Sequence, residues 1–290
     1  MSTSTLRLAS ALAALLVAGG GLALVSRRPV PPRPPIARRG APLDELRQRL
    51  YDAVQPVRLA NCTLERFGEA HDGGYLMCGN LLAPAAGYSY GISGYDGWGC
   101  QMSKRFGIPV HQYDCFDPRR PSCEGGDTRF HGECVAGEAS VDPSGRPFDA
   151  VAAQVTRNGD PGKRLVMKMD VEGAEWASLL AAPREVLEQI DQLTIELHLN
   201  GPDLWTKWLV VSKLRDVFHV AHHHVNNYGC RDDLAPFPSW AIEVLFVNKR
   251  LAVAVPGGPP IVRPHPLDAP NDPTRPDCQY APGTRPTGIR

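Results

Sequence analysis

Apolar and polar positions along the middle of the chain fall into blocks of two kinds. Short continuous apolar runs, typical of buried strands, alternate with stretches in which apolar residues recur every three or four positions, as on one face of a helix. The predicted strands cover residues 87–93, 109–113, 130–135, 165–169, 193–197, 218–224 and 241–247. The predicted helices cover residues 42–54, 98–106, 148–157, 176–190 with an interruption at Pro183, and 204–217.

Strands that alternate with helices favour an α/β fold, with a doubly wound, mostly parallel, Rossmann-like sheet that carries helices on both faces. The last two predicted strands have no helix between them, so we expect an antiparallel pair at the edge of the sheet. We assign residues 42–255 to this domain, because both ends of the chain differ from it in composition.

The N-terminal end contains an uncharged, mostly apolar run at residues 8–25, after a short tail at 1–7. As a helix it would span roughly 27 Å, just enough to cross the core of a bilayer. A cleaved signal peptide is the alternative, but its apolar region would be long and no good A-x-A cleavage site follows. We therefore predict an uncleaved transmembrane signal-anchor.

Proline dominates the two segments that flank the domain. Residues 26–41 are rich in proline and arginine, which favours an extended linker. Residues 256–290 are rich in proline and almost free of large apolar side chains, so we expect a tail that is disordered or draped over the domain.

Charge excludes one class of function, and the cysteines bear on the compartment. Lysine plus arginine total 31 and aspartate plus glutamate total 31, whereas nucleic-acid-binding proteins carry a basic excess. The even number of cysteines, 8, behind an export-like segment favours disulfides in an oxidising compartment. Arginines after the apolar run favour the opposite side, the cytosol. Between the two, we expect the lumen of the secretory pathway.

Ligands of open α/β sheets bind at the carboxyl ends of the strands, and the first such end carries a glycine-rich loop. The loop contains Gly91, Ile92, Ser93, Gly94 and Asp96. Its glycines let the backbone approach a ligand closely, and the helix that follows offers its N-terminus to negative charge. An ordinary strand-to-helix turn uses the same residue types.

The second strand end carries Asp114, which lies 23 residues after Gly91. A carboxylate at this place can accept the hydroxyl protons of a ribose, as in dinucleotide sites. Asp117 is the competing candidate, although before Pro118 it also suits the start of a turn.

The third strand end releases carboxylates, among them Asp170 and Glu172, over a glycine turn. Buried acids are costly unless they face a ligand cleft.

A run of three histidines at 222–224 is the only other conspicuous cluster. Since alternate residues of a strand face opposite sides, only His222 and His224 could share a metal, and no cysteine or acid lies nearby at ligand spacing. We therefore predict no metal site.

Several of these motifs resemble one family. The string KMDVEGAEW at residues 168–176 resembles the D-x-E-G-A-E signature of FkbM-type methyltransferases and of related membrane-anchored methyltransferase-like proteins of animals. Residues 88–117 resemble their strand, loop and second strand that bind S-adenosylmethionine (SAM). DGGY at residues 72–75 resembles their D-G-G-Y segment, and IELH at 195–198 their fifth-strand motif. The loop departs from the commoner D-x-G-x-G pattern of methyltransferases.

The resemblance implies a class I methyltransferase fold that binds SAM and transfers its methyl group, with oxygen as the expected acceptor atom. The acceptor would be a small molecule or a glycan. Such an enzyme aligns a nucleophile with the methyl group and excludes water, and it needs a base only if a hydroxyl must lose its proton. Asp170 and Glu172 are the first candidates for this cleft, followed by Glu196 and His198. For Glu196, a capping or salt-bridging role is the alternative.

Two other classes of function stay open. A membrane-tethered glycosyltransferase would present Asp170 and Glu172 to a divalent metal that holds a sugar nucleotide. A non-catalytic binding domain is also compatible with the fold, because a fold does not guarantee an activity. A lumenal location favours this second alternative, since SAM would have to be imported.

Overall fold

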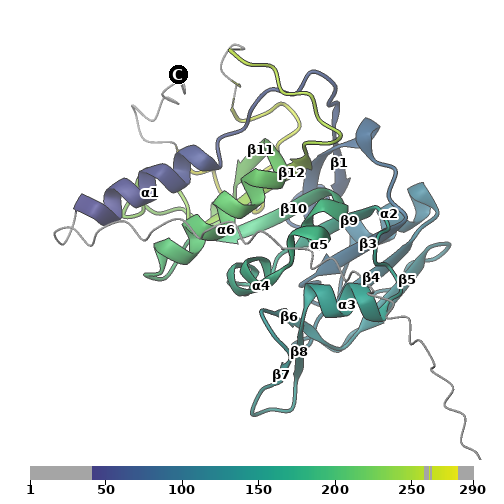
Figure 1. Ribbon diagram of the computed structural model, residues 1–290. Coiled ribbons are helices and arrows are strands. Elements are labelled where there is room, and N and C mark those ends of the chain that lie inside the picture. Colours follow the sequence, from purple (N-terminus) through teal and green to yellow (C-terminus); the bar gives the residue numbers. More distant parts are fainter. Residues whose placement is uncertain (1–40, 258–260, 262, 280–290) are drawn as a thin grey trace, which may run out of the picture. The chain divides into compact units, whose positions relative to one another are not determined.

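The computed structural model describes residues 41–257, 261 and 263–279 of the chain (Figure 1). Its centre is a seven-stranded sheet in the order β11-β12-β10-β9-β3-β4-β5. The strands are β3 (Ala86–Tyr90), β4 (Pro109–Tyr113), β5 (Asp127–His131), β9 (Leu165–Met169), β10 (Ile190–His198), β11 (Phe218–Val225) and β12 (Ala241–Asn248). β12 runs antiparallel to β10 and β11, and the other neighbours are parallel. The predicted α/β fold with a mostly parallel sheet and an antiparallel last pair is confirmed.

The order of the strands reverses in the middle of the sheet. β4 and β5 follow β3 on one side, whereas β10 and the last pair follow β9 on the other side. The crevice above the junction of β3 and β9 is therefore a topological switch point, the place where open α/β sheets bind ligands.

Helices cover both faces of the sheet, because each buries an apolar stripe against it. One face carries α1 (Ala41–Ala53), α3 (Val151–Arg157), α4 (Glu175–Ala181), α5 (Arg184–Gln189) and α6 (Leu204–Val217). α1 packs along α6 (Figure 1). The other face carries α2 (Gly97–Phe106) and the hairpin of β1 (Leu64–Gly68) and β2 (Gly74–Cys78). Gly107 ends α2 in the left-handed conformation, with φ of 63°.

The hairpin is fixed to the sheet by one side chain. Gln192 of β10 accepts from the amide of Cys78 at 2.9 Å and donates to its carbonyl at 2.8 Å, as a neighbouring strand would. The tight turn that precedes Gly74 thus lies over the polar end of the sheet. Two short 3-10 turns, η1 (Gly79–Leu81) and η2 (Asn227–Gly229), complete the elements.

Some predicted elements are wrong in part. The strand expected at residues 87–93 ends at Tyr90, where the glycine loop begins. The single strand expected at residues 130–135 is two strands, because β5 ends at His131 and Gly132 turns the chain into β6 (Cys134–Ala136). β6 belongs to a separate small sheet with β7 (Ser140–Val141) and β8 (Pro147–Ala150). β8 also takes the first residues of the helix expected at 148–157, which begins at Val151.

All eight cysteines are paired, which confirms the predicted disulfides. The bonds join Cys62 to Cys78, Cys100 to Cys123, Cys115 to Cys134 and Cys230 to Cys278. Disulfides in this number indicate an oxidising compartment of the secretory type.

The described part of the C-terminal tail lies draped on the domain. The Cys230–Cys278 bond attaches it, and Asn227 donates to the carbonyl of Asp272 at 2.9 Å. Asn271 and Asp272 are buried. The predicted tail at 1–7, the signal-anchor at 8–25, most of the linker at 26–41 and the last residues of the tail lie outside the described residues. Among the residues that are described, no helix is long and apolar enough to cross a membrane.

Candidate functional site

A cavity of about 210 Å³ opens at the carboxyl ends of β3, β4 and β9. We call it the switch-point cavity. Its lining comes from the three loops that follow these strands and from the small sheet: Tyr90, Gly91, Ser93, Tyr113, Asp114, Phe116, Cys134, Val135, Phe148, Asp170, Val171, Glu172 and Ala174. The lining includes five predicted site residues, namely Gly91, Ser93, Asp114, Asp170 and Glu172.

The glycine loop passes very close to the end of β9. Gly91 has φ of 70°, and a Cβ atom there would lie 1.6 Å from the carbonyl oxygen of Asp170. Only glycine fits, so the loop and the acidic turn form one continuous rim. Buried Lys168 holds this junction, because its Nζ donates to the carbonyl of Gly91 at 2.5 Å.

Asp114 lines the cavity, but its oxygens are already used by the main chain. Oδ2 accepts from the amides of Ile92 and Ser93 at 3.1 and 2.8 Å. Oδ1 accepts from the amides of Phe116 and Asp117 at 2.8 and 3.0 Å. The carboxylate therefore joins the two loops of the rim, which is a structural role at the place where a ribose partner was predicted.

The other predicted loop residues do not line the cavity. Asp96 caps α2, where it accepts from Gly99 at 2.8 Å and from Gln112 at 2.8 Å, and burial raises its pKa. Asp117 forms an ion pair with Arg119 at 2.5 Å, on the outer side of the loop. The side chain of Ile92 is buried, and Gly94 lies next to that ion pair.

Two aromatic side chains form a wall that sequence analysis missed. Phe116 is 66% exposed, and its ring centroid lies 6.4 Å from that of Phe148 in an edge-on arrangement. For Phe116 the sequence does offer a signal, because it is an aromatic residue two positions after Asp114. Phe148 carries no such signal, because it reaches the cavity from the separate small sheet.

The four residues predicted to act on an acceptor meet around the imidazole of His198, at the end of β10. Its Nε2 lies 3.9 Å from Asp170 Oδ1 and 3.4 Å from Glu196 Oε1. The same nitrogen lies 3.3 Å from Glu172 Oε2, and Nδ1 lies 3.3 Å from Glu175 Oε1. We call these five residues the acid–histidine cluster.

Strand register explains why the cluster forms. Ile195 of β10 pairs with Met169 of β9 in a parallel register, so the residues that follow each of them lie side by side. Glu172 follows in a tight turn, where its φ of 52° is unusual for a residue with a side chain. Such backbone conformations gather at functional sites.

Burial and neighbouring charges shift the titration of the cluster. Burial, and next the charge of Glu196, raise the pKa of Asp170 to about 7. Burial also raises the pKa of Glu196. Burial alone would lower the pKa of His198, but the carboxylates of Glu175 and Glu196 beside its ring outweigh burial and raise it to about 10. At neutral pH the ring of His198 is therefore an imidazolium, and the carboxyl group of Asp170 exchanges a proton near this pH.

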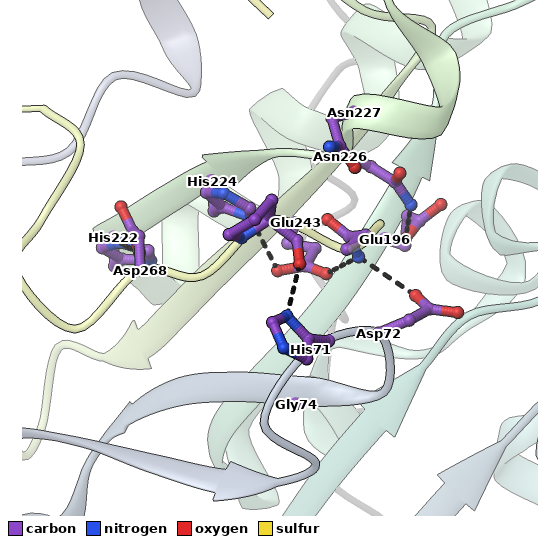
Figure 2. A network of polar contacts seen from close by, with 12 residues as sticks. His71, Asp72, Gly74, Glu196, His222, His224, Asn226, Asn227, Glu243 and Asp268 are labelled. Atoms are coloured by element: carbon purple, nitrogen blue, oxygen red, sulfur yellow. Dashed lines mark hydrogen bonds and ion pairs between the residues drawn. The ribbon is translucent and has the colours of Figure 1, made fainter. Parts of the chain in front are cut away.

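Figure 2 shows a second group of polar contacts, which lies beside Glu196. Asn271 of the tail donates to Asp72 Oδ1 at 3.0 Å and to Glu243 Oε1 at 2.7 Å. His224 Nδ1 lies 3.4 Å from Glu243 Oε2. Together with Glu196, which pairs with Glu243 across β10 and β12, these residues form a polar row that is buried except at Asp72.

The histidines at 222 and 224 do have acids beside them. His222 Nε2 lies 2.9 Å from Asp268 Oδ1 of the tail, and His224 contacts Glu243. The sequence-based argument that no acid lies near them is wrong, because the folded chain brings acids to them from distant segments. These two histidines are part of ion pairs with single carboxylates.

Two sets of side chains in the described residues have the geometry of metal ligands. One is Asp170, Glu196 and His198, and the other is Asp72, Glu196 and Glu243. In each set the ligand atoms lie within 4.8 Å of one another.

The sequence matches no protein-family model and no curated protein. The resemblance to FkbM-type methyltransferases therefore stays an interpretation of short motifs.

Proposed function

We propose that this protein is a SAM-dependent methyltransferase that transfers the methyl group to an oxygen of a small-molecule or glycan acceptor. The observation that carries the proposal is the switch-point cavity, which has a glycine loop on one side and the acid–histidine cluster on the other. Numbered along the chain, the seven strands of the sheet lie in the order 3-2-1-4-5-7-6, and the seventh is reversed. SAM-dependent methyltransferases use this order, which supports the proposal.

The walls of the cavity suit an adenosine group. Phe116 and Phe148 offer aromatic surface, and Val135 and Val171 offer aliphatic surface. Base stacking on an aromatic side chain contributes about 1–3 kcal/mol in nucleic-acid sites. The bare backbone at Gly91 lets the rest of the cofactor approach the end of β9.

The reaction needs little from the protein beyond alignment and proton removal. The acceptor oxygen attacks the methyl carbon, the carbon–sulfur bond breaks, and its electron pair returns to sulfur, so the sulfonium becomes a thioether. The hydroxyl proton passes to a carboxylate. Asp170 and Glu172 are our candidates for this step, because both line the cavity and lie beside His198.

Ligand binding tests the proposal directly. We expect the full chain in detergent micelles to bind SAM and S-adenosylhomocysteine with micromolar dissociation constants in calorimetry. The same protein should give no heat with a uridine-diphosphate sugar, with or without Mn²⁺. Binding of the sugar nucleotide alone would instead support a glycosyltransferase, and binding of SAM without turnover of any hydroxyl acceptor would support a non-catalytic domain.

A variant pair sharpens the same titration. Phe116→Ala should weaken SAM binding by roughly 5- to 100-fold, since it removes the stacking surface. Its melting temperature should stay unchanged because the ring is exposed. Tyr228→Ala, which removes a 50% exposed aromatic ring that does not line the cavity, is the matched control. Equal affinities of the two variants would remove Phe116 from the site.

We further propose that residues 8–25 anchor the protein as a single-pass membrane protein whose domain faces the secretory lumen. The four disulfides support this orientation over the cytosolic one that the flanking arginines favour. Protease added to sealed microsomes should leave the domain intact, and it should digest the domain once detergent opens the vesicles. Digestion in sealed microsomes would place the domain on the cytosolic face.

A further inference from the structure

We propose that Asp170, Glu196 and His198 bind a divalent transition-metal cation at the edge of the switch-point cavity. The three ligand atoms lie within 4.8 Å of one another, and the two distances from His198 Nε2 are 3.4 and 3.9 Å. Ligands bound at about 2.1 Å around one ion lie about 3–4.2 Å apart. Both distances from His198 Nε2 fall in this range, and a third separation of at most 4.8 Å requires only a small movement of the carboxylates.

The imidazole itself points to a ligand. His198 is buried, with 1% of its side chain exposed, and its Nε2 makes no hydrogen bond with any residue that the structure describes. This nitrogen faces the carboxylates of Asp170 and Glu196. A buried polar atom without a hydrogen bond is costly, and a bound cation would satisfy it.

The other nitrogen of His198 has the partner that a metal-binding histidine needs. Nδ1 lies 3.3 Å from Oε1 of Glu175, a fully buried carboxylate that also accepts from the His198 amide at 2.8 Å. When a cation binds, it replaces the proton on Nε2, and the imidazole keeps its proton on Nδ1 beside Glu175. This carboxylate–histidine arrangement is the usual support of a metal site.

The two carboxylate ligands have different surroundings, one being oriented by a neighbouring side chain and the other facing the cavity. Asn226 donates to Glu196 Oε2 at 3.0 Å, which turns Oε1 toward His198. Asp170 is 27% exposed on the cavity side, so the open coordination positions of the ion would face the cavity. Open positions distinguish catalytic metal sites from closed structural ones.

Charge favours occupation of this site. Three buried or partly buried carboxylates, Asp170, Glu175 and Glu196, surround His198. The nearby Lys168 donates to the carbonyls of Tyr90 and Gly91. Buried carboxylates are normally paired or coordinate a metal.

The second possible set, Asp72, Glu196 and Glu243, is a poorer site. The amide of Asn271 already bridges Asp72 and Glu243 (Figure 2). A cation there would have to displace this amide and the tail segment that carries it.

One imidazole and two carboxylates suit Mn²⁺, Fe²⁺ or Zn²⁺ better than Ca²⁺ or Mg²⁺, which prefer oxygen alone. A cation at this edge would hold the acceptor hydroxyl and lower its pKa, and Glu172 would remain free to take the proton. This role rests on the proposed methyl transfer, whereas the binding of the metal does not.

Titration with Mn²⁺ tests the site without SAM or activity. We expect the full chain in detergent, stripped with a chelator, to bind one Mn²⁺ with a micromolar dissociation constant in electron paramagnetic resonance. Pulsed spectra should show coupling to one directly bound ¹⁴N nucleus. Asp170→Asn should weaken binding by more than about 100-fold, since loss of a supporting partner alone costs 10- to 100-fold. Asp72→Asn, from the other set, should bind as the wild type does.

Each contrary result has a definite meaning. If the wild type binds no Mn²⁺ below millimolar concentration, or if the bound ion shows no nitrogen coupling, the site does not exist. If Asp72→Asn loses the ion and Asp170→Asn keeps it, the other set is the metal site and this assignment is wrong. A separate SAM titration of the stripped protein keeps failure of the metal site distinguishable from failure of the proposed function.

Discussion

A carboxylate accepts about four hydrogen bonds, and in Asp114 main-chain amides supply all four. The residue therefore acts through the loops it joins. The same residue type at a strand end can hold a ribose, and a sequence does not distinguish the two roles because both use the same place in the fold.

Replacement of Asp114 by asparagine separates these roles. The amide would present N–H groups to two main-chain donors, so we expect a loss of about 2 kcal/mol in the free energy of unfolding. For a domain of this size the melting temperature should fall by roughly 4–8 °C. Scanning calorimetry measures this. An unchanged melting temperature together with lost SAM binding would show instead that Asp114 binds the ribose of SAM.

At the scale of elements, strands that are continuous apolar runs were predictable. β4, β9 and the helix α6 have the bounds expected from the sequence. The small sheet of β6, β7 and β8 was not predictable, since its strands are short and carry both polar and apolar side chains. The predicted acceptor residues do meet, because parallel register places the ends of β9 and β10 together. Residues brought by distant segments, such as Phe148 and Asn271, leave no pattern in the local sequence.

The Cys115–Cys134 disulfide ties the small sheet to the turn of Asp114 and forms part of the cavity wall. Replacement of both cysteines by serine should lower stability by about 3 kcal/mol, and it should also weaken SAM binding because Val135 and Phe148 are released. The Cys62–Cys78 pair closes a loop of similar length, 16 against 19 residues, away from the cavity. Its double serine variant should lose stability but keep its affinity. If both double variants lost the same affinity for SAM, the loss would come from lower global stability and not from the cavity wall.

Stability of the whole domain should depend on a buried layer of rings across β3, β4 and β5. Tyr113 stacks on His131 at 4.5 Å, and Tyr88 stacks on His111 at 5.1 Å. Burial, and next the neighbouring His131, lower the pKa of His111 to about 4. Burial also lowers the pKa of His131. Both rings are therefore neutral when the domain is folded at neutral pH.

The sign of the pH dependence follows. The unfolded chain binds protons at these histidines near pH 6.5, whereas the folded domain resists protonation of His111 down to about pH 4. Their contribution to stability is complete above pH 6.5 and is lost as the pH falls toward 4. Denaturant unfolding of wild type and His111→Gln between pH 7 and 4 should show a smaller acid loss for the variant. Parallel curves would mean that His111 does not couple to folding.

The draped tail also constrains the order of events during synthesis. Residues 263–279 leave the ribosome after the entire sheet, yet Asn271 and the partner of Cys230 come from this segment. Until it arrives, Asp72 and Glu243 lack the amide that bridges them, and Cys230 is unpaired. The nascent domain therefore carries a reactive thiol and unbridged carboxylates that the mature one does not, and oxidative folding enzymes and chaperones have that interval in which to recognise it.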